Sequence, residues 1–553
     1  MIDFEKEKWL VTCALPYVNG PIHIGHVKST YIPADIFVRF LKLNKENVLF
    51  VCGSDTHGTP ITIEAEKEGL TPKQLVSKYH NLAIKSFKDL GIDFDHYSST
   101  DNKTNHDLTK HFFKRHLENG FVTKEIVNEY YCEKCKRFLP DRYVKGTCPH
   151  CNAKDQYSDY CESCSRTIEK WKIIDPYCAV CGSKPIARDS EHYFFKLSEF
   201  SDQLKDFLKG ATIAEEVKNY VLQWLKEGLK DWDIVRDLDW GVKVPGLENK
   251  TYYVWFDAPI FYVSATIEWA KKNKKKWEEY WKSPKTKIVH FIGKDIIYHH
   301  CLFWPAMLIG TREKFSLPSI IPVRGYATLE GKKISKSRKW WILIDDFVKV
   351  FPGDYLRFYL TLTTPSKPTD GDFKWKEFQK KINSELVGNI GNFIYRTLSF
   401  IHTKFGGKVP EAGEFDDADE EFEKRIKEAA KSIGNELENI ELEKALRKIL
   451  EFSGFCNQYF QKKEPWRDLE RAKACLYLSI NAVRSLAIAL EPFLPSSAEK
   501  LWNQLNLKDS VHEQKWDSLS KIEIKPRHKI NRPEILFKKV EDVDIDNQLT
   551  KLR

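Results

Sequence analysis

Long apolar runs are absent from this sequence. No stretch of its 553 residues approaches the roughly 18 uncharged apolar residues that a membrane-spanning helix needs. The first residues, MIDFEKEKW, are charged and contain no apolar segment of the kind found in a secretory signal. These absences exclude a membrane partner, so we expect a cytoplasmic protein.

Internal repeats and low-complexity tracts are also missing, and acidic and basic residues nearly balance. The net charge is +9, with charged residues forming 30% of the chain. This balance excludes a polycationic tail but permits an anionic partner. At about 150 residues per domain, the length corresponds to roughly three to five domains.

Cysteine is scarce outside one short segment. Eight of the thirteen cysteines lie between Cys132 and Cys181, and a disulfide-stabilised protein would not gather them in this way without a secretory signal. Two knuckles with a two-residue gap close a structural zinc site of four thiolates. The segment contains four such knuckles and so predicts two zinc ions, with reactive dithiols as the alternative. The spacing does not say which knuckle pairs with which among Cys132/Cys135, Cys148/Cys151, Cys161/Cys164 and Cys178/Cys181.

Strand-like and helix-like segments alternate through residues 1–118. The runs KWLVTCAL and ENVLFVCGS are typical of buried parallel strands, whereas IPADIFVRFLKL and LVSKYHNLAIKSFKDL have apolar residues at helical spacing. The alternation is lost in the cysteine-rich segment and returns with the strand-like TYYVWFDAPIFYV and KIVHFIGKDII. We therefore expect an α/β protein whose parallel nucleotide-binding sheet is interrupted by an inserted module.

From about residue 376 onward the pattern is helical. The 3.6-residue period is clear in FQKKINSELVGNIGNFIYRTLSFI, FEKRIKEAAKSIGNELENI, LEKALRKILEFSGFCNQYFQ and AKACLYLSINAVRSLAIAL. These segments predict a helix bundle that follows the sheet. The final segment is mixed, and KIEIKP and EILFKKV within it are strand-like.

The stretch PIHIGH follows the first predicted strand. His23 and His26 lie three residues apart and share one face of a first helical turn, and Gly25 lets a base or a phosphate approach the backbone. A helix N-terminus suits phosphate, and two imidazoles there can donate hydrogen bonds to a phosphate chain as charge builds in a transition state. The alternative is a capping turn with two surface histidines.

A second polar stretch, GKKISKSRK, covers residues 331–339. Lysines on such a short loop can close on a triphosphate and neutralise the departing pyrophosphate. Alone, the loop would be an ordinary solvated turn. Together with HIGH in one split α/β fold, it indicates ATP chemistry that uses Lys333, Lys336, Ser335 and Ser337.

The two motifs together resemble the HIGH and KMSKS signatures of the class I aminoacyl-tRNA synthetases. Over residues 5–540 the chain is similar to one family of that class, the methionyl-tRNA synthetases. The resemblance is carried by ALPYVNGPIHIGH, GSDTHGTPI, LPDRYVKGTCPHC, RDSEHYFF, YVWFDAPI, HFIGKDI, FWPAML and DYLRFYL. It implies methionine–tRNA ligase activity. ATP activates L-methionine to methionyl-adenylate with release of pyrophosphate, and the methionyl group then passes to the 3′-terminal adenosine of initiator and elongator tRNA(Met) with release of AMP.

The resemblance implies a Rossmann-type catalytic domain that is split by a zinc-knuckle connective insertion and followed by an α-helix-bundle anticodon-binding domain. The expected bounds are 1–118 and 230–325 for the catalytic halves, 119–229 for the insertion, 326–380 for the KISKS loop and stem-contact region, 381–520 for the bundle, and 521–553 for a C-terminal segment packed back on the body. Some members keep only the middle two knuckles. This implies nested zinc sites, with Cys148, Cys151, Cys161 and Cys164 in one and Cys132, Cys135, Cys178 and Cys181 in the other.

By resemblance, His23 and His26 hold the ATP phosphates in the adenylation transition state, and Lys336, with Lys333, stabilises the departing pyrophosphate. Mg²⁺ is expected to accompany the ATP. No protein nucleophile is needed, so catalysis is expected to consist of positioning and electrostatics. The expected ATP-binding residues are Pro16, Gly25, Gly293, Asp295, Ser335 and Ser337.

The resemblance also implies a methionine pocket in which Asp55 binds the α-ammonium group through a charge-assisted contact. The other expected pocket residues are Leu15 and Tyr17 at the entrance, and Trp255, Ala258, Pro259, Ile260, Tyr262, Ile296 and His300 around the thioether. The sequence departs from the family conservatively at Ile334. Three further departures bear on the pocket wall and not on the class of substrate, namely Phe261, His299 and Arg324.

For tRNA, the resemblance implies that Asn392, Arg396 and Trp466 read a CAU anticodon. Asn392 and Arg396 are four residues apart and share a helix face, and Trp466 can stack on an unstacked base. A capped helix and a core tryptophan are the alternative. Many relatives carry a further C-terminal tRNA-binding and dimerising module that is not visible here, so we expect a monomer, or a chain whose tRNA-binding module is a separate protein.

Other functions compete with this interpretation. A non-catalytic RNA-binding protein has no use for both motifs, and other adenylyl-transferring enzymes with an HxGH turn are usually short. Synthetases for isoleucine, valine or leucine carry a far larger editing insertion. The cysteine enzyme uses zinc in its amino-acid pocket, whereas the knuckles here look closed.

Overall fold

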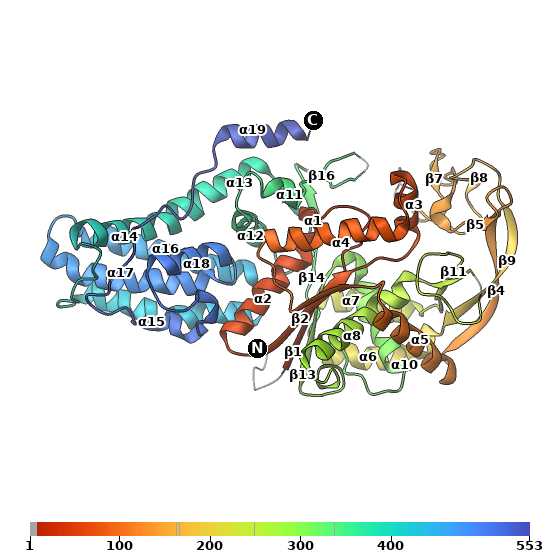
Figure 1. Cartoon of the computed structure of the whole chain (residues 1–553), viewed down its shortest axis with the longest axis horizontal. Helices are drawn as coiled ribbons and strands as arrows, with labels where there is room; N and C mark the ends of the chain where they lie inside the picture. Colours follow the sequence, from red (N-terminus) through yellow and green to blue (C-terminus); the bar gives the residue numbers. More distant parts are fainter. Residues whose placement is uncertain (1–7, 162, 165, 248, 337, 553) are drawn as a thin grey trace.

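The computed structural model describes residues 8–161, 163–164, 166–247, 249–336 and 338–552. Ser337, one of the expected ATP-binding residues, therefore lies outside the described residues. A five-stranded parallel sheet forms the centre of the larger body (Figure 1), with the strand order β14-β13-β1-β2-β3. Its strands are β1 (Lys8–Cys13), β2 (Asn47–Ser54), β3 (His96–Ser99), β13 (Thr286–Gly293) and β14 (Val323–Arg324).

Both faces of this sheet are covered by helices. Trp9 and Val11 of β1 point into one core with residues of helix α2 (Ile32–Leu43), whereas Leu10 points into a second core with residues of α5 (Lys103–Glu118) and α8 (Val254–Asn273). Strands buried on both faces form continuous apolar runs, which explains the sequence of β1. The Rossmann-type sheet predicted from the sequence is confirmed.

The chain leaves this sheet after α5 and returns to it only with β13. The intervening segment extends as a long antiparallel ladder between β4 (Val122–Cys132) and β9 (Ile186–Phe195), in the sheet order β10-β9-β4-β5. A small three-stranded sheet made of β6 (Val144–Thr147), β7 (Gln156–Tyr157) and β8 (Ile174–Cys178) lies at its far end, at the right of Figure 1. The other two strands of the larger sheet are β5 (Arg137–Phe138) and β10 (Trp232–Asp233).

A helical domain lies at the opposite end of the molecule, at the left of Figure 1. A continuous helix runs through α13 (Trp375–Lys381), a π-helical stretch (Ile382–Gly391) and α14 (Asn392–Lys404). The predicted bundle is confirmed, and its other helices are α15 (Asp417–Glu438), α16 (Leu442–Lys463), α17 (Leu469–Leu490) and α18 (Pro495–Gln504). Within α17, residues 472–490 are long and apolar enough to cross a membrane, but 89% of that window is buried inside the protein, as expected of a bundle's central helix.

The remaining elements connect these three parts. Between β2 and β3 lie α3 (Thr59–Glu68) and α4 (Pro72–Asp89), and β15 (Ala327–Leu329) pairs with both β16 (Lys332–Lys333) and β17 (Gly371–Phe373). Others are α6 (Ser201–Gly210), α7 (Glu215–Glu227), β11 (Val235–Arg236), β12 (Thr251–Tyr252), α9 (Glu278–Trp281), α10 (Trp304–Gly310), α11 (Ile344–Phe347), α12 (Gly353–Leu362) and α19 (Asp542–Lys551).

Three strand predictions were wrong in whole or in part. TYYVWFDAPIFYV contributes only the short strand β12, and the rest forms α8. Every residue of α8 from Phe256 to Thr266 is buried, so the run has no amphipathic period, and its aromatic and branched residues are those typical of a strand. In the C-terminal segment, KIEIKP and EILFKKV form no strand but pack as extended chain, with Ile524 and Phe537 buried.

Candidate active site

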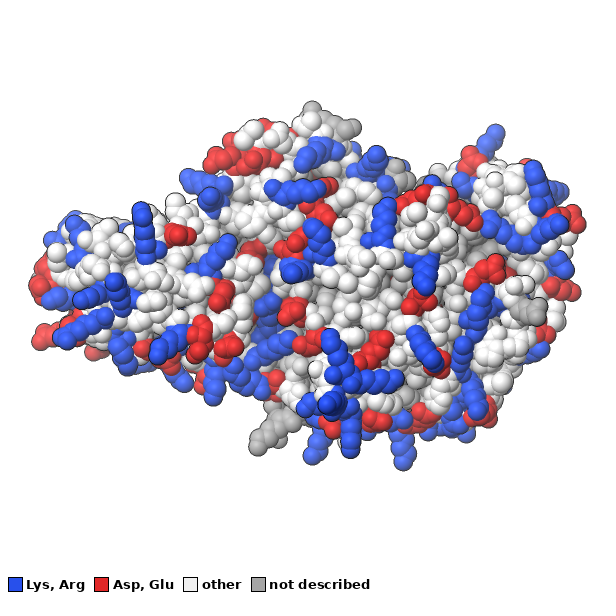
Figure 2. Space-filling view, viewed as in Figure 1, with Lys and Arg blue, Asp and Glu red and all other residues white. Residues whose placement is uncertain are grey.

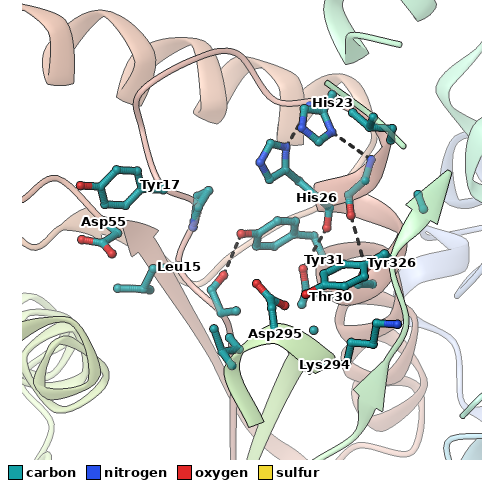
Figure 3. A pocket seen from close by; sticks show the side chains of 18 of the residues that line it. Leu15, Tyr17, His23, His26, Thr30, Tyr31, Asp55, Lys294, Asp295 and Tyr326 are labelled. Atoms are coloured by element: carbon teal, nitrogen blue, oxygen red, sulfur yellow. Dashed lines mark hydrogen bonds between the residues drawn. The ribbon is translucent and has the colours of Figure 1, made fainter. Parts of the chain in front are cut away.

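A cavity of about 840 Å³ opens at the carboxyl ends of β1 and β13 (Figure 3). The chain order reverses at this point, because β2 continues the sheet on one side of β1 and β13 on the other. Open parallel sheets bind their ligands at such a switch point.

The cavity gathers most of the predicted residues from segments that are far apart in the chain. Those that line it are Leu15, Pro16, Tyr17, His23, Gly25, His26, Asp55, Trp255, Ala258, Pro259, Tyr262, Gly293, Asp295, Ile296, His300, Lys333 and Lys336. Two of the predicted residues that the structure describes do not line the cavity. Ile260 is fully buried in the core beneath the sheet, and Ser335 pairs through its backbone with Trp340.

The HIGH turn is fixed by its own side chains. His23 is the N-cap of a helix that begins at Ile24, and its Nδ1 accepts a hydrogen bond of 3.1 Å from the amide of Gly25. The Nδ1 of His26 accepts one of 3.1 Å from the amide of His23, which completes a reciprocal capping box. A Cβ on Gly25 would lie 2.9 Å from the His23 ring, so the turn requires glycine.

Both imidazoles are neutral hydrogen-bond donors. Burial lowers the pKa of His23 well below its ordinary value and lowers that of His26 to about 4. Because each Nδ1 accepts from a backbone amide, the ring proton of each neutral imidazole is on Nε2. The two rings lie side by side, with centroids 3.8 Å apart. The turn thus presents two N–H donors without a permanent charge.

Asp55 supplies the anionic end of the cavity. It follows β2, is 6% exposed, and its Oδ1 has no hydrogen-bond partner among the described residues. Burial, together with the nearby negative charge of Asp257, raises the pKa of Asp55 well above its usual range. A buried carboxylate with a free oxygen facing a cavity suits a cationic ligand group.

The other end of the cavity is aromatic and apolar. The Tyr262 hydroxyl donates to Nε2 of His300 at 2.8 Å, because Nδ1 of His300 donates to the carbonyl of Ile296 at 3.2 Å. Burial lowers the pKa of His300 to about 4, so this ring is also neutral. With Trp255 and Ala258 these groups form a wall that fits an uncharged, polarisable side chain.

The three departures from the family do not line the cavity. Phe261 faces the core, where its ring occupies the space that a Cβ on Gly53 would need. His299 stacks on the outer side of Trp255 with ring centroids 3.7 Å apart. Arg324 is 2% exposed and donates to the carbonyl of Ile440 in the helical domain at 3.3 Å. None of these three side chains therefore lines the cavity.

The KISKS loop lies over the HIGH turn. Ser335 and Trp340 close it as a narrow hairpin, and Leu343 after the loop pairs with His23. The ammonium group of Lys336 donates to the carbonyl of Asn19 and lies 3.0 Å from the Glu64 carboxylate. The loop lysine is therefore held at the rim of the cavity.

Several residues that line the cavity were not predicted from the sequence. Lys294 forms an ion pair of 2.7 Å with Asp370 at the cavity edge. Lys294 lies between the predicted Gly293 and Asp295, so its position was a usable signal, whereas nothing near Asp370 marked it. The other unpredicted lining residues are Ala14, Ser29, Thr30, Tyr31, Tyr326, Ala327, Thr328 and Ile334.

The cysteine knuckles form two separate clusters of four. Cys132, Cys135, Cys178 and Cys181 form one cluster, and Cys148, Cys151, Cys161 and Cys164 form the other. The nested pairing that the resemblance implies is the one the structure shows.

The donor geometry of both clusters fits zinc. Sulfur atoms approach within 3.4 Å for Cys132 and Cys181 and 3.6 Å for Cys151 and Cys161. The corresponding edge of a tetrahedron with Zn–S bonds of about 2.3 Å is roughly 3.8 Å. Backbone amides also donate to sulfur at 3.4 Å in both clusters, which stabilises thiolates.

The three predicted anticodon residues lie on one surface of the helical domain. Asn392 and Arg396 line a shallow depression between α14 and α16, and Arg396 lies over the ring of Trp466 with 5.6 Å to its centroid. Trp466 is 45% exposed, so it is not a core residue. On the face shown in Figure 2, basic and acidic side chains are interspersed over this domain.

Comparison with known proteins gives a consistent result. The chain matches the family model described as "tRNA synthetases class I (M)" over residues 9–398. It also matches the model described as "Anticodon binding domain of methionyl tRNA ligase" over residues 409–552.

Similar curated proteins carry one name. Methionine--tRNA ligase of Methanopyrus kandleri is 47% identical over 550 residues, which cover 98% of this chain and 81% of that protein. The protein of the same name from Pyrococcus furiosus is 43% identical over 558 residues, which cover 97% of this chain and 76% of that one. Among solved structures, methionyl-tRNA synthetase of Mycobacterium tuberculosis bound by methionyl-adenylate superposes with a TM-score of 0.79 at 24% identity, covering 96% of this chain and all of that one. This last likeness supports the fold.

Proposed function

The chain belongs to the methionyl-tRNA synthetase family of the class I synthetases, and from that premise we propose how its residues divide the reaction. It is a methionine–tRNA ligase that activates L-methionine with ATP and transfers the methionyl group to tRNA(Met). The observation that carries the assignment of roles is the single cavity in which the free Asp55 oxygen, the neutral histidine pair and the loop lysines meet.

Methionine binds with its two ends in different surroundings. Asp55 accepts hydrogen bonds from the α-ammonium group, and the thioether lies against Trp255, Tyr262 and His300. Trp255, Tyr262 and the neutral His300 carry no charge, and the hydroxyl of Tyr262 is already bonded to His300. A buried charge would have no partner at this wall, so the pocket favours an uncharged side chain over a charged one.

In the first step, a carboxylate oxygen of methionine attacks the α-phosphorus of ATP, and the bond from that phosphorus to the bridging oxygen of pyrophosphate breaks. His23 and His26 donate from Nε2 to the phosphate oxygens as negative charge moves toward the leaving group. Lys336 and Lys333 then neutralise the departing pyrophosphate. For Lys336 this requires leaving Glu64, since the loop holds it there before ATP binds. Mg²⁺ supplies further charge neutralisation when it enters with ATP.

In the second step, a ribose hydroxyl of the 3′-terminal adenosine attacks the methionyl carbonyl, and AMP leaves. The anticodon is read far from this site by Asn392, Arg396 and Trp466, where the exposed indole stacks on an unstacked base. We propose a monomer in the cytoplasm, where its tRNA is used. The cysteine clusters hold two structural zinc ions, and a closed set of four thiolates supplies no open position for chemistry.

The proposal is tested through methionine-dependent exchange of pyrophosphate into ATP. Asp55→Asn is expected to raise the KM for methionine about 100-fold or more, because the ammonium group loses its charged partner. Asp239→Asn is the control, since the Asp239 side chain is 91% exposed and outside the cavity. An Asp55→Asn protein with an unchanged KM would contradict this assignment.

A further inference from the structure

A buried histidine follows the predicted ammonium-binding carboxylate closely along the chain. His57, two residues after Asp55, is 1% exposed and does not line the cavity. Its carbonyl accepts a hydrogen bond from the Tyr17 hydroxyl. Gly58 beside it has φ +98°, and a Cβ there would lie 2.8 Å from the same hydroxyl. The loop is therefore fixed in one conformation.

Carboxylates face both nitrogens of this ring. Oδ2 of Asp257, in the first turn of α8 and fully buried, lies 2.7 Å from Nδ1 of His57. Oδ1 of Asp101 lies 3.9 Å from Nε2, and Asp101 is in turn 3.2 Å from Nε2 of His106 on α5. The other ring packed against His57 is the uncharged Trp240, with centroids 5.9 Å apart.

The pKa values follow from this arrangement. Burial alone would lower the pKa of His57, but the charges of Asp257 and Asp101 more than offset it and raise the pKa to about 10. Asp55 and Asp257 are both buried, and the negative charge of Asp257 disfavours the ionised form of Asp55. The positive charge of His57 opposes this repulsion at Asp55.

A metal ion is the competing occupant of this cluster. One possible ligand atom from each of His57, Asp101 and His106 lies close enough to the others to bind one cation. A metal ion at Nε2 of His57 would have to displace the proton there, which the Asp101 carboxylate faces. Because a carboxylate faces each ring nitrogen of His57, the arrangement favours a protonated ring over a bound metal ion.

We infer that His57 is a positioning residue: as an imidazolium held between Asp257 and Asp101, it favours the ionised form of the Asp55 carboxylate that the ammonium group of the amino acid requires. The inference rests on the proposed function, because it concerns the same binding group. It adds His57, a residue that contacts no substrate itself but influences the charge of Asp55, which does.

Removal of the imidazolium gives the first test, by pyrophosphate exchange with methionine as the varied substrate. His57→Gln is expected to raise the KM for methionine about 10- to 100-fold at pH 7, with a smaller change in kcat, because Asp55 takes up a proton at higher pH. The acid limb of kcat/KM for methionine should move to higher pH. His96→Gln is the matched control, since His96 pairs with Glu268 of the same helix α8 at 3.1 Å and lies outside the cavity.

A double variant separates an electrostatic role from a structural one. In His57→Gln/Asp257→Asn the repelling charge of Asp257 is also gone, so the KM for methionine should return to within about fivefold of wild type. If His57 only supports the loop, the second substitution adds damage and the KM rises further. Thermal unfolding of each variant shows whether it is folded.

Asp101→Asn keeps both rings and tests the same idea if His57→Gln does not fold. Removing this carboxylate lowers the pKa of His57, so the rise of KM at alkaline pH should begin at lower pH than in wild type, while the KM at pH 7 stays the same. An unchanged alkaline limb in Asp101→Asn contradicts the inference.

The possible failures are distinguishable. If wild-type protein shows no methionine-dependent exchange, the proposed function fails. If wild type exchanges but His57→Gln keeps its KM and acid limb, only the inference about His57 is overturned. A bound metal ion beyond those of the cysteine clusters, lost in both His57→Gln and His106→Gln, would also overturn it.

Discussion

His23 and His26 are hydrogen-bond donors that are both fixed in position and uncharged. They donate hydrogen bonds from fixed positions, because each Nδ1 is occupied by a backbone amide, and they remain uncharged because they are buried. Such donors gain most where negative charge develops, which is the condition for stabilising a transition state more than a ground state.

Replacement of one of these donors should act on rate more than on binding. His26→Ala is expected to lower kcat for methionine-dependent pyrophosphate exchange by about 100- to 1,000-fold, with a much smaller change in the KM for ATP. His402→Ala, at an exposed position of α14, serves as the control. Equal changes in kcat for the two variants would contradict the role of His26.

The resemblance could not show which side chains of this segment point into the cavity and which point into the core. Ala258, Pro259 and Tyr262 line the cavity, whereas Ile260 and Phe261 between them are fully buried in the core. A helix turns about 100° per residue, so positions i, i+1 and i+4 share one face. The resemblance located the segment correctly but placed Ile260 in the pocket, whereas the helix turns its side chain into the core.

At the scale of elements, the KISKS loop is docked before ATP arrives. Its Lys336 lies between the Asn19 carbonyl and the Glu64 carboxylate of α3. The acidic side chain therefore competes with the triphosphate for the same ammonium group.

Weakening that contact should make the loop available to ATP. Glu64→Gln is expected to lower the KM for ATP about two- to fivefold, the range of a partly exposed ion pair. Glu66→Gln is the matched control on the same helix, since Glu66 pairs with Arg137 at 3.1 Å instead. An ATP KM that is the same in both variants would show that the docking has no energetic consequence.

The two cysteine clusters are independent of each other, because each closes on its own four sulfur atoms. Wild-type protein should contain about two zinc ions per chain by elemental mass spectrometry. Cys148→Ser should contain about one zinc ion, since only the cluster that includes Cys148 and Cys151 loses a ligand. Cys456→Ser changes a buried cysteine of the bundle and should leave the zinc content unchanged. Retention of two zinc ions in Cys148→Ser would contradict the assignment of ligands.

The surface around Trp466 should affect tRNA and not the adenylation step. Trp466→Ala is expected to lower kcat/KM for tRNA(Met) in aminoacylation about 10- to 100-fold, as the loss of one base stack predicts, while pyrophosphate exchange stays normal. Tyr220→Ala, which removes a 53% exposed ring from α7, should leave both reactions unchanged. A normal tRNA response in Trp466→Ala would exclude Trp466 as a reader of the anticodon.

At the scale of the whole molecule, buried histidines set the dependence of stability on pH. Burial lowers the pKa values of His26, His116 and His300 to about 4, whereas the unfolded value is about 6.5. Their contribution to stability is therefore present above pH 6.5 and is lost as the pH falls toward 4. His57 behaves in the opposite sense, because its raised pKa favours the folded state below pH 6.5 and that contribution is lost as the pH rises toward 10.

Thermal stability should therefore be highest near neutral pH. Between pH 6.5 and 4 the Tm is expected to fall, because each buried histidine reduces the free energy of unfolding by up to about 1.4 kcal/mol for each unit by which its pKa is lowered. His116→Asn should reduce the slope, because one proton fewer is taken up on unfolding. A Tm that is constant over this range would contradict the buried, neutral state of these rings.

The whole architecture was more predictable than its contacts. The split parallel sheet, the cysteine insertion and the helical domain followed from periodicity and motif order, since these depend on local pattern. The pairing of Lys294 with Asp370 and of Arg324 with Ile440 could not be predicted. Both link segments that are far apart in the sequence and that only the tertiary fold brings together.

The central claim is that the cavity at the ends of β1 and β13 activates methionine. Pyrophosphate exchange into ATP, measured with zinc-replete protein against each of the twenty amino acids, tests it most directly. The account predicts exchange with methionine alone. Exchange driven by isoleucine, leucine, valine or cysteine, or by no amino acid, would contradict it.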